Sequence, residues 1–156
     1  MTSGRPDLAA MIGPLGRTLL ALEAPILEAH GLGMWAYAVL LGLDEEPVRT
    51  QTALAEAIGA DKTRIIKTLD DLTARGLIER RPDPADRRVR LLSITAEGRR
   101  LRDSTQAAIQ RAEESLLERL TPAERDTFLE ALQKLIQTPV WSQGRKSDSG
   151  REATAG

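Results

Sequence analysis

The sequence has 156 residues, 41% hydrophobic and 29% charged, with a net charge of −1, which suits one globular domain or one domain with added helices for assembly. It contains no cysteine and one histidine, His30, so a disulfide framework and a thiol switch are excluded and a zinc site would depend on carboxylates. The N-terminus lacks the basic start and apolar run of a signal peptide. We also find no apolar stretch near the roughly 20 residues that are needed to cross a bilayer. We therefore expect a cytoplasmic protein without a membrane partner.

The first predicted element is a long helix. Apolar residues recur every three or four positions over residues 8–30, after about six residues that we expect to be disordered. Pro14 and Pro25 each remove an amide donor, so we expect them to start, kink or split this helix. Gly31 is a typical residue at a helix end. A second, strongly apolar helix is expected over residues 34–43.

Two short helices with a tight turn between them come next. Thr50 is a plausible N-cap of a helix that Gly59 closes. Asp61 then caps a second helix that ends at Gly76. Two short helices joined in this way predict a helix-turn-helix.

The rest of the chain predicts a hairpin and two more helices. Residues 77–81 and 88–94 are expected to form two strands joined by a Pro-Asp-Pro-Ala-Asp turn. Thr95 is expected to cap a long helix, and Thr121, followed by proline and then by glutamate at the third helical position, marks the start of the last one. From Ser142 the polar tail has no periodicity, and we expect disorder.

This order of elements predicts a mainly α fold with a small β-hairpin wing. The expected parts are a disordered N-terminus (1–6), a helical dimerisation region (7–30 and 96–141), a winged helix-turn-helix domain (31–95) and a disordered tail (142–156). The fifth helix has a wide apolar face, which consists of Ala108, Ile109, Ala112, Leu116, Leu117 and Leu120. One small core can hardly cover this face and those of the first and last helices, so burial against a second copy is expected, with a larger monomeric bundle as the alternative.

The second helix of the helix-turn-helix carries side chains that suit DNA. At about 100° per residue, one face of the helix over residues 62–75 is apolar and is expected to pack inward. The other face and its flanks present Thr63, Arg64, Ile66 and Lys67. Cations suit guanine edges or phosphates, threonine suits either, and apolar groups suit thymine methyls. An ordinary solvated helix face is the alternative.

The turn of the hairpin is basic and stiff. From Asp61 to Arg90 the sequence has nine Lys or Arg against six Asp or Glu, and the tip carries Arg87 and Arg88 beside Asp86. The two prolines limit the conformational freedom of the turn. An arginine at such a tip can enter a narrow minor groove. Asp86 can hold this arginine by a bidentate ion pair. A solvated charged turn is the alternative, which the combination of helix and hairpin makes less plausible.

The run from Gly59 to Gly98 resembles the multiple-antibiotic-resistance-regulator (MarR) family of winged-helix transcription factors. The specific elements are Leu72 with Gly76-Leu77-Ile78 and Arg80, the Asp83-x-x-Asp86-x-Arg88 wing, and the Leu92-x-Ile94-Thr95-x-x-Gly98 exit. The likeness extends from about Leu19 to Ile136. It implies an obligate homodimer that places one winged helix per subunit on a pseudo-palindromic operator.

By this resemblance, Arg88 is the wing arginine and Asp86 its orienting partner. Ile66 stands where the family usually has threonine, and Lys67 replaces a more usual arginine, which keeps the charge but loses bidentate geometry. The operator therefore cannot be taken from a relative. Together, the residues and the resemblance give the candidate DNA contacts Thr50, Lys62, Thr63, Arg64, Ile66, Lys67, Asp86, Arg87 and Arg88.

Members of this family often release DNA when a small anionic or phenolic compound binds between the dimerisation helices and the winged helix. His30, Trp35 and Tyr37 lie near the junction of the first two helices, and aromatic walls with a titratable group suit a planar acid. They are the candidate ligand residues. The alternatives are core packing of Tyr37 and an interaction of His30 with the helix dipole.

The resulting hypothesis is a homodimeric, sequence-specific DNA-binding transcriptional regulator, most often a repressor, with a small aromatic or anionic effector. The alternative is a winged-helix module that binds protein, although such a module has no need for Arg64 and Lys67 on the helix as well as Arg87 and Arg88 on the wing. The sequence has no catalytic triad, phosphate-loop or metal-ligand spacing, so we expect neither an enzyme nor a cofactor or metal.

Overall fold

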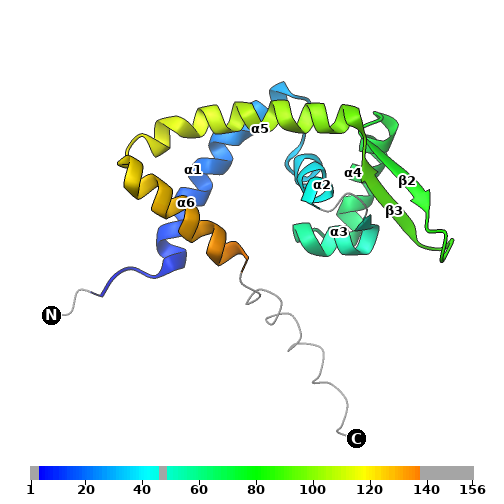
Figure 1. Ribbon diagram of the computed structural model, residues 1–156, viewed down its shortest axis with the longest axis horizontal. Coiled ribbons are helices and arrows are strands. Elements are labelled where there is room, and N and C mark those ends of the chain that lie inside the picture. Colours follow the sequence, from blue (N-terminus) through cyan, green and yellow to red (C-terminus); the bar gives the residue numbers. More distant parts are fainter. Residues whose placement is uncertain (1–3, 46–48, 138–156) are drawn as a thin grey trace, which may run out of the picture. The chain divides into compact units, whose positions relative to one another are not determined.

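The structure, a computed structural model, describes residues 4–45 and 49–137. Its elements are α1 (Leu8–Ala29), α2 (Met34–Glu45), β1 (Arg49–Thr50), α3 (Gln51–Ile58), α4 (Lys62–Ala74), β2 (Ile78–Pro82), β3 (Arg90–Ile94), α5 (Ala96–Leu117) and α6 (Pro122–Ile136) (Figure 1). The predicted mainly α fold with a hairpin is confirmed. The expected tail from Ser142 lies outside the described residues.

Contacts divide the chain into two compact units, residues 1–114 and residues 115–156. The first unit contains α1 to α4, the three strands and most of α5, and the second contains the last residues of α5 and all of α6. The predicted boundaries between a dimerisation region and a DNA-binding domain concern function, and they stay a prediction.

The ends of α3 and α4 follow from local chemistry. The hydroxyl of Thr50 accepts a hydrogen bond from the amide of Ala53 at 3.0 Å, and the carboxylate of Asp61 accepts one from the amide of Thr63 at 3.2 Å. Each satisfies an amide of the first helical turn that has no partner within the helix. Gly59 ends α3 with a φ of 68°, a left-handed conformation that suits glycine. The predicted helix-turn-helix is therefore confirmed.

The expectation that proline would start or split the first helix is wrong. Pro14 and Pro25 both lie inside α1, which continues over 22 residues. Each proline removes one backbone hydrogen bond, whereas the other bonds of so long a helix keep it formed.

The expectation that no apolar stretch approaches the length of a membrane span is also wrong. By length and composition, α1 passes this test, because it combines 22 residues with few charges. This is weak evidence for a membrane span, since core helices and signal sequences of other proteins pass the same test. Only 6% of its apolar window is buried, so α1 is an apolar helix that presents most of its surface.

The sheet has three strands in the order β1-β3-β2, all antiparallel. Arg80 of β2 lies opposite Leu92 of β3, and Thr50 of β1 lies opposite Leu91. The sequence predicted the hairpin of β2 and β3 but not β1, whose two residues are too few to show an alternating pattern. Because β1 pairs with β3, the start of α3 is fixed beside the wing.

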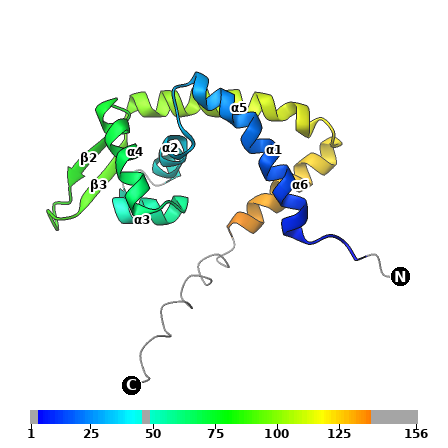
Figure 2. The ribbon, with the colours of Figure 1, turned by 180° about the vertical axis from the view of Figure 1, so that it is seen from behind.

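The core of the first unit lies where α2, α3, α4 and the sheet meet (Figure 2). Its fully buried side chains include Val39, Leu40, Leu43, Leu54, Ile65, Leu69, Leu72, Ile78 and Leu92. Helices α2 and α3 approach closely at Gly42, where an added Cβ would lie 2.9 Å from the side chain of Leu54. The predicted inward face of α4 is confirmed by the burial of Ile65, Leu69 and Leu72.

A tight junction joins the wing to the start of α5. The amide of Thr95 donates to the carbonyl of Leu77 at 3.1 Å, and its hydroxyl donates to the carbonyl of Gly76 at 2.7 Å. The same hydroxyl accepts from the amide of Gly98 at 3.0 Å, which confirms Thr95 as the N-cap. Gly98 is buried against the backbone of Leu77, and an added Cβ would overlap the carbonyl oxygen of Leu77.

In the second unit, α6 begins with the predicted capping box. The backbone amide of Thr121 donates to the carboxylate of Glu124 at 2.8 Å, and the amide of Glu124 donates to the hydroxyl of Thr121 at 3.3 Å. No residue of α6 is buried. Its exposed large apolar side chains are Phe128, Leu129, Leu132, Leu135 and Ile136.

Candidate nucleic-acid interface

The first half of α4 presents polar and apolar groups to solvent. Lys62, Thr63, Arg64 and Lys67 are all exposed, and 46% of the surface of Ile66 is accessible. The rest of the helix is held against the core by its apolar face. Five of the first six positions of a fixed helix therefore offer cationic, hydroxyl and aliphatic groups, a combination that can contact both phosphates and base edges.

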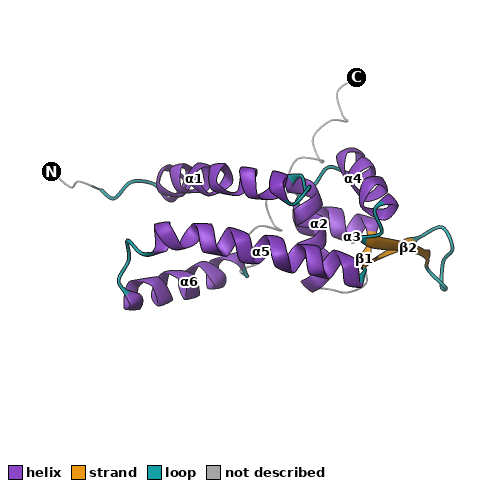
Figure 3. Cartoon of the chain, turned by 90° about the horizontal axis from the view of Figure 1, so that it is seen from above, coloured by secondary structure: helices purple, strands orange, loops and turns teal. Residues whose placement is uncertain are grey.

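The turn between β2 and β3 forms a loop at the end of the hairpin (Figure 3). Its own hydrogen bonds close it. The amide of Asp83 donates to the carbonyl of Val89 at 2.9 Å, and the amide of Val89 donates to the carbonyl of Asp86 at 2.9 Å. The carboxylate of Asp83 accepts from the amide of Ala85 at 2.9 Å. Because these bonds already order the tip, less conformational entropy is lost when it contacts a partner.

Asp86 contacts Arg88, but not through the expected bidentate pair. One carboxylate oxygen, Oδ1, accepts from the Arg88 backbone amide at 3.1 Å and from its Nε at 3.3 Å. With 91% of its side chain exposed, Arg88 remains accessible to a partner. Asp86 thus contacts the Nε atom of the guanidinium rather than its two terminal nitrogens. Arg87 is exposed at the same tip.

A depression of about 290 Å³ lies where α3, α4 and the wing meet. It is lined by Thr50, Gln51, Thr52, Lys62, Arg88, Val89 and Arg90. Three cations therefore face a depression that also borders the N-terminus of α3, where unpaired amides and the helix dipole favour an anion. The three cations and the N-terminus of α3 favour an anionic group such as a phosphate.

This depression brings together three of the candidate residues, Thr50, Lys62 and Arg88. The others do not line it: Thr63, Arg64, Ile66, Lys67, Asp86 and Arg87. Sequence reasoning missed Gln51, Thr52 and Arg90. The N-cap signal at Thr50 could have indicated the first two, because it locates the free amides at the start of α3.

An ion pair fixes the wing to α4. The Nη1 atom of Arg80 lies 2.5 Å from Oδ1 of Asp70, and only 26% of the Arg80 side chain is exposed. Arg80 belongs to β2 and Asp70 lies in the second half of α4. The contact therefore sets the orientation of the hairpin against the helix, and with it the spacing of the two cationic elements.

The candidate ligand residues do not line this depression. His30 follows the last residue of α1, and its Nδ1 lies 2.8 Å from the carbonyl of Ile26, which also accepts a hydrogen bond from the backbone amide of His30 at 3.1 Å. Trp35 is half-buried, and Tyr37 belongs to the core with 9% of its surface exposed. The structure thus gives His30 and Tyr37 structural roles, and it leaves a ligand role for the three as a prediction.

Two acidic residues lie in the surroundings of Tyr37. Burial raises the pKa of Tyr37, and the carboxylates of Glu23 and Glu113 raise it further while Arg102 opposes them. Burial also raises the pKa of Glu23, to which Glu113 adds, and the pKa of Glu113, to which Glu114 adds. The region is therefore partly desolvated and acidic, and its carboxylates are less stable in the ionised form than in water.

We expect Glu23→Gln to stabilise the protein at pH 7 more than at pH 4. A carboxyl whose pKa is raised by folding contributes stability below its unfolded pKa, and this contribution is lost as the pH rises through the folded pKa. Thermal unfolding at both pH values and at fixed protein concentration measures the difference. Glu28→Gln, an exposed site on the same helix, is the control. A lower melting temperature for Glu23→Gln at pH 7 would contradict the expectation.

Within the described ranges, no group of three or more His, Asp or Glu side chains could hold a metal ion.

Comparison with known proteins links this geometry to a family of regulators. Residues 30–89 match the sequence profile of the MarR family. The chain is similar to the transcriptional regulator HosA of Escherichia coli O111:H-, with 32% identity over 100 residues that cover 64% of this chain and 74% of that protein.

Two solved structures of the regulator CouR are similar to this chain. CouR from Rhodococcus jostii RHA1, bound to p-coumaroyl-CoA, is 31% identical, with a TM-score of 0.70 and coverage of 84% of this chain and 90% of CouR. The transcriptional repressor CouR bound to a 23-mer DNA duplex is 28% identical, with a TM-score of 0.72 and coverage of 84% and 93%.

Proposed function

Because this chain belongs to the MarR family, we propose that it is a DNA-binding transcriptional regulator that acts in the cytoplasm. We further propose that it is a homodimer that represses transcription from a pseudo-palindromic operator and is released by a small effector. The depression in which the cations of α4 and the wing meet the N-terminus of α3 is the observation that carries this proposal.

Each part of the interface has a role in the proposed complex. The exposed first half of α4 enters the major groove, where Thr63, Arg64, Ile66 and Lys67 reach base edges or phosphates. The wing tip places Arg87 or Arg88 in the adjacent minor groove. A backbone phosphate then occupies the depression between them, which fixes the register of both elements on the duplex. The structure of CouR bound to a 23-mer DNA duplex supports double-stranded DNA as the partner.

Exposed apolar helices support the homodimer. In the first unit, α1 exposes Leu8, Met11, Ile12 and Leu20, each with 43% or more of its surface accessible. In the second unit, α6 exposes five large apolar side chains and buries none. Exposed apolar faces of this sort mark interaction surfaces. A second copy of the chain can bury the apolar faces of both α1 and α6. We therefore assign residues 7–30 and 96–141 to dimerisation and residues 31–95 to DNA binding.

An effector is supported by the CouR complex with p-coumaroyl-CoA. The surroundings of Tyr37 constrain its chemistry, since the carboxylates of Glu23 and Glu113 raise the pKa of Tyr37 whereas Arg102 lowers it. A free anion would meet repulsion from the two carboxylates. We therefore propose that the effector is an aromatic compound that binds beside His30 and Trp35. Its acid group is neutral, is esterified or lies outside this region.

Selection of bound sites from a random duplex library, at a stated salt concentration, tests the proposed function. We expect an inverted repeat with half-sites about one helical turn apart, because two winged helices related by a two-fold axis contact one face of the duplex. No enrichment, with only weak and salt-sensitive binding, would favour a winged-helix module that binds protein.

We expect Arg88→Ala to weaken binding to every duplex and to lower the slope of log affinity against log salt by about one unit. Arg88 lines the depression and is almost fully exposed, so its loss removes one cationic contact close to the phosphates without disturbing the core. Fluorescence anisotropy at several salt concentrations measures both quantities. Arg100→Ala removes another exposed arginine, 70% accessible and paired with Glu97 on α5, and is the control. An unchanged affinity and slope for Arg88→Ala would remove the wing from the interface.

A further inference from the structure

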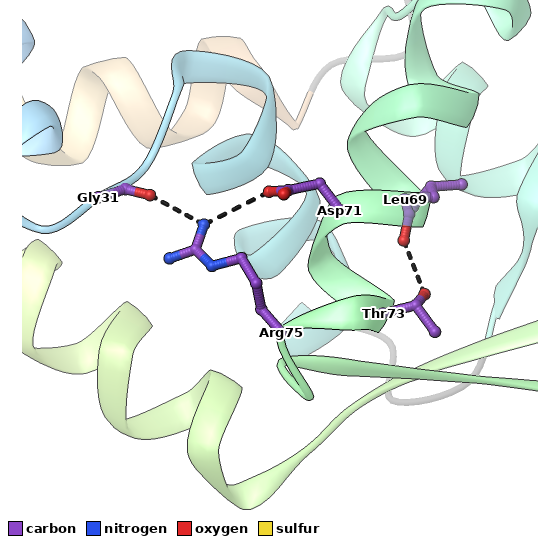
Figure 4. Close-up of polar contacts among 5 residues, drawn as sticks. All are labelled: Gly31, Leu69, Asp71, Thr73 and Arg75. Carbon is purple, nitrogen blue, oxygen red and sulfur yellow. Dashed lines mark hydrogen bonds and ion pairs between the residues drawn. The ribbon is translucent and has the colours of Figure 1, made fainter.

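Arg75 connects the end of α4 to the turn between α1 and α2 (Figure 4). It follows the last residue of α4, and its Nη1 donates to the carbonyl of Gly31, 44 residues away, at 2.9 Å. The same nitrogen lies 3.5 Å from the carboxylate of Asp71, one turn earlier in α4. The guanidinium is thus placed between its own helix and a distant backbone carbonyl.

The acceptor belongs to an ordered turn. The amide of Gly31 donates to the carbonyl of Glu28 at 2.9 Å, and the amide of Leu32 donates to the carbonyl of Leu27 at 2.9 Å. Gly31 has a φ of 66°, and Leu27 and Leu32 are both buried. A Cβ at Gly31 would lie 3.4 Å from Nη2 of Arg75, so the arginine is in close contact with the turn. Arg75 therefore contacts a fixed point at the end of α1.

Two arginine contacts hold the second half of α4. Asp70, in the middle, pairs with Arg80 of the wing, and Arg75, at the end, reaches the α1–α2 turn. The first half projects beyond both contacts. Arg64 lies 11 residues before Arg75, which is about 16 Å along a helix, so a tilt of about 5° at the end would move Arg64 by roughly 1.4 Å. A displacement of this size is enough to break a hydrogen bond to a base.

We propose that Arg75 is a positioning residue that couples the tilt of the recognition helix to the end of α1 through the carbonyl of Gly31. This inference rests on the proposed function, and it concerns the regulation of the same interface. A change at the α1–α2 turn, from an effector or from a rearrangement of α1, then alters operator affinity without touching DNA.

The first test compares Arg75→Met, Arg75→Lys and Arg100→Met. We measure affinity for the selected operator and for an unrelated duplex over a range of salt concentrations. Arg75→Met keeps the aliphatic stem but removes the donors, so we expect operator affinity to fall roughly three- to tenfold, the loss of one charge-assisted hydrogen bond. Affinity for the unrelated duplex and the salt slope should stay unchanged. Arg75→Lys should restore most of the operator affinity, and Arg100→Met should resemble the unmodified protein.

The second test needs no DNA. Amide hydrogen exchange of the free protein reports on the α1–α2 turn and on the last turn of α4, where the amides of Leu32 and Gly76 are both hydrogen-bonded. In Arg75→Met, exchange should rise severalfold in both segments together, and Arg100→Met should leave both unchanged. If the unmodified protein shows no operator preference, the proposed function fails, while exchange still decides whether Arg75 couples the two segments.

Two results would overturn the inference. An equal loss of affinity on both duplexes, with a lower salt slope, would make Arg75 a direct phosphate contact. Unchanged exchange in the last turn of α4 would show that the contact with Gly31 does not restrain the helix.

Discussion

Gly98→Ala lowers the free energy of unfolding by about 2–3 kcal/mol, as expected for overpacking at a closed backbone contact. The added methyl group would overlap the carbonyl oxygen of Leu77 and lie 2.8 Å from the side chain of Ile94. The carbonyl cannot move away without losing the hydrogen bond from the amide of Thr95. The gain of helix propensity on replacing glycine by alanine, up to about 1 kcal/mol, offsets only part of this cost.

Urea unfolding at fixed protein concentration measures the change in stability caused by Gly98→Ala. Gly33→Ala is the control, because a methyl group at this exposed glycine would meet nothing within 4 Å. It should change stability by no more than about 0.5 kcal/mol. An equal effect of the two substitutions would mean that α5 adjusts its position against Leu77 without strain.

Arg64→Ala changes which bases the protein prefers and costs about 1–3 kcal/mol on the best sites, if the side chain reads a base edge. Arg64 is exposed on the first half of α4 and does not line the depression. It is therefore separate from the cations that we assign to a phosphate. A contact to a base edge discriminates among sequences, whereas a contact to a phosphate does not.

The measurement is a second library selection with Arg64→Ala, followed by affinities for the original operator and for single-base variants. We expect relaxed preference at one position in each half-site and little change at the others. Arg88→Ala is the comparison, because it should keep the preference and lower every affinity. A uniform loss with Arg64→Ala would assign this arginine to the backbone as well.

Local signals were sufficient where a single turn of chain decides the structure. The caps at Thr50, Asp61, Thr95 and Thr121 depend on hydrogen bonds within a few residues, and all four mark helix starts in the structure. The inward face of α4 follows from helical periodicity in the same way. The candidate DNA residues were found by these signals and by the wing motif, and they lie on exposed surfaces.

Contacts between distant segments could not be predicted in this way. Strand β1 has only two residues, and its pairing with β3 joins positions about 40 residues apart. The depression depends on that pairing, since it brings Gln51 and Thr52 beside Arg90. The hydrogen bond from Arg75 to Gly31 leaves no periodic signal either. In α1, Pro14 and Pro25 neither start nor split the helix, because a long helix retains enough other hydrogen bonds.

The single residue between β3 and α5 determines where this scaffold accepts insertions. Thr95 alone separates the two elements, and its hydrogen bonds fix it to Gly76 and Leu77. One inserted residue would rotate α5 by about 100° and turn buried Thr105 and Ile109 out of the core. The wing turn has no such constraint beyond its own hydrogen bonds. Residues 84–88 can therefore be exchanged without displacing α5, whereas the β3–α5 junction must keep its length.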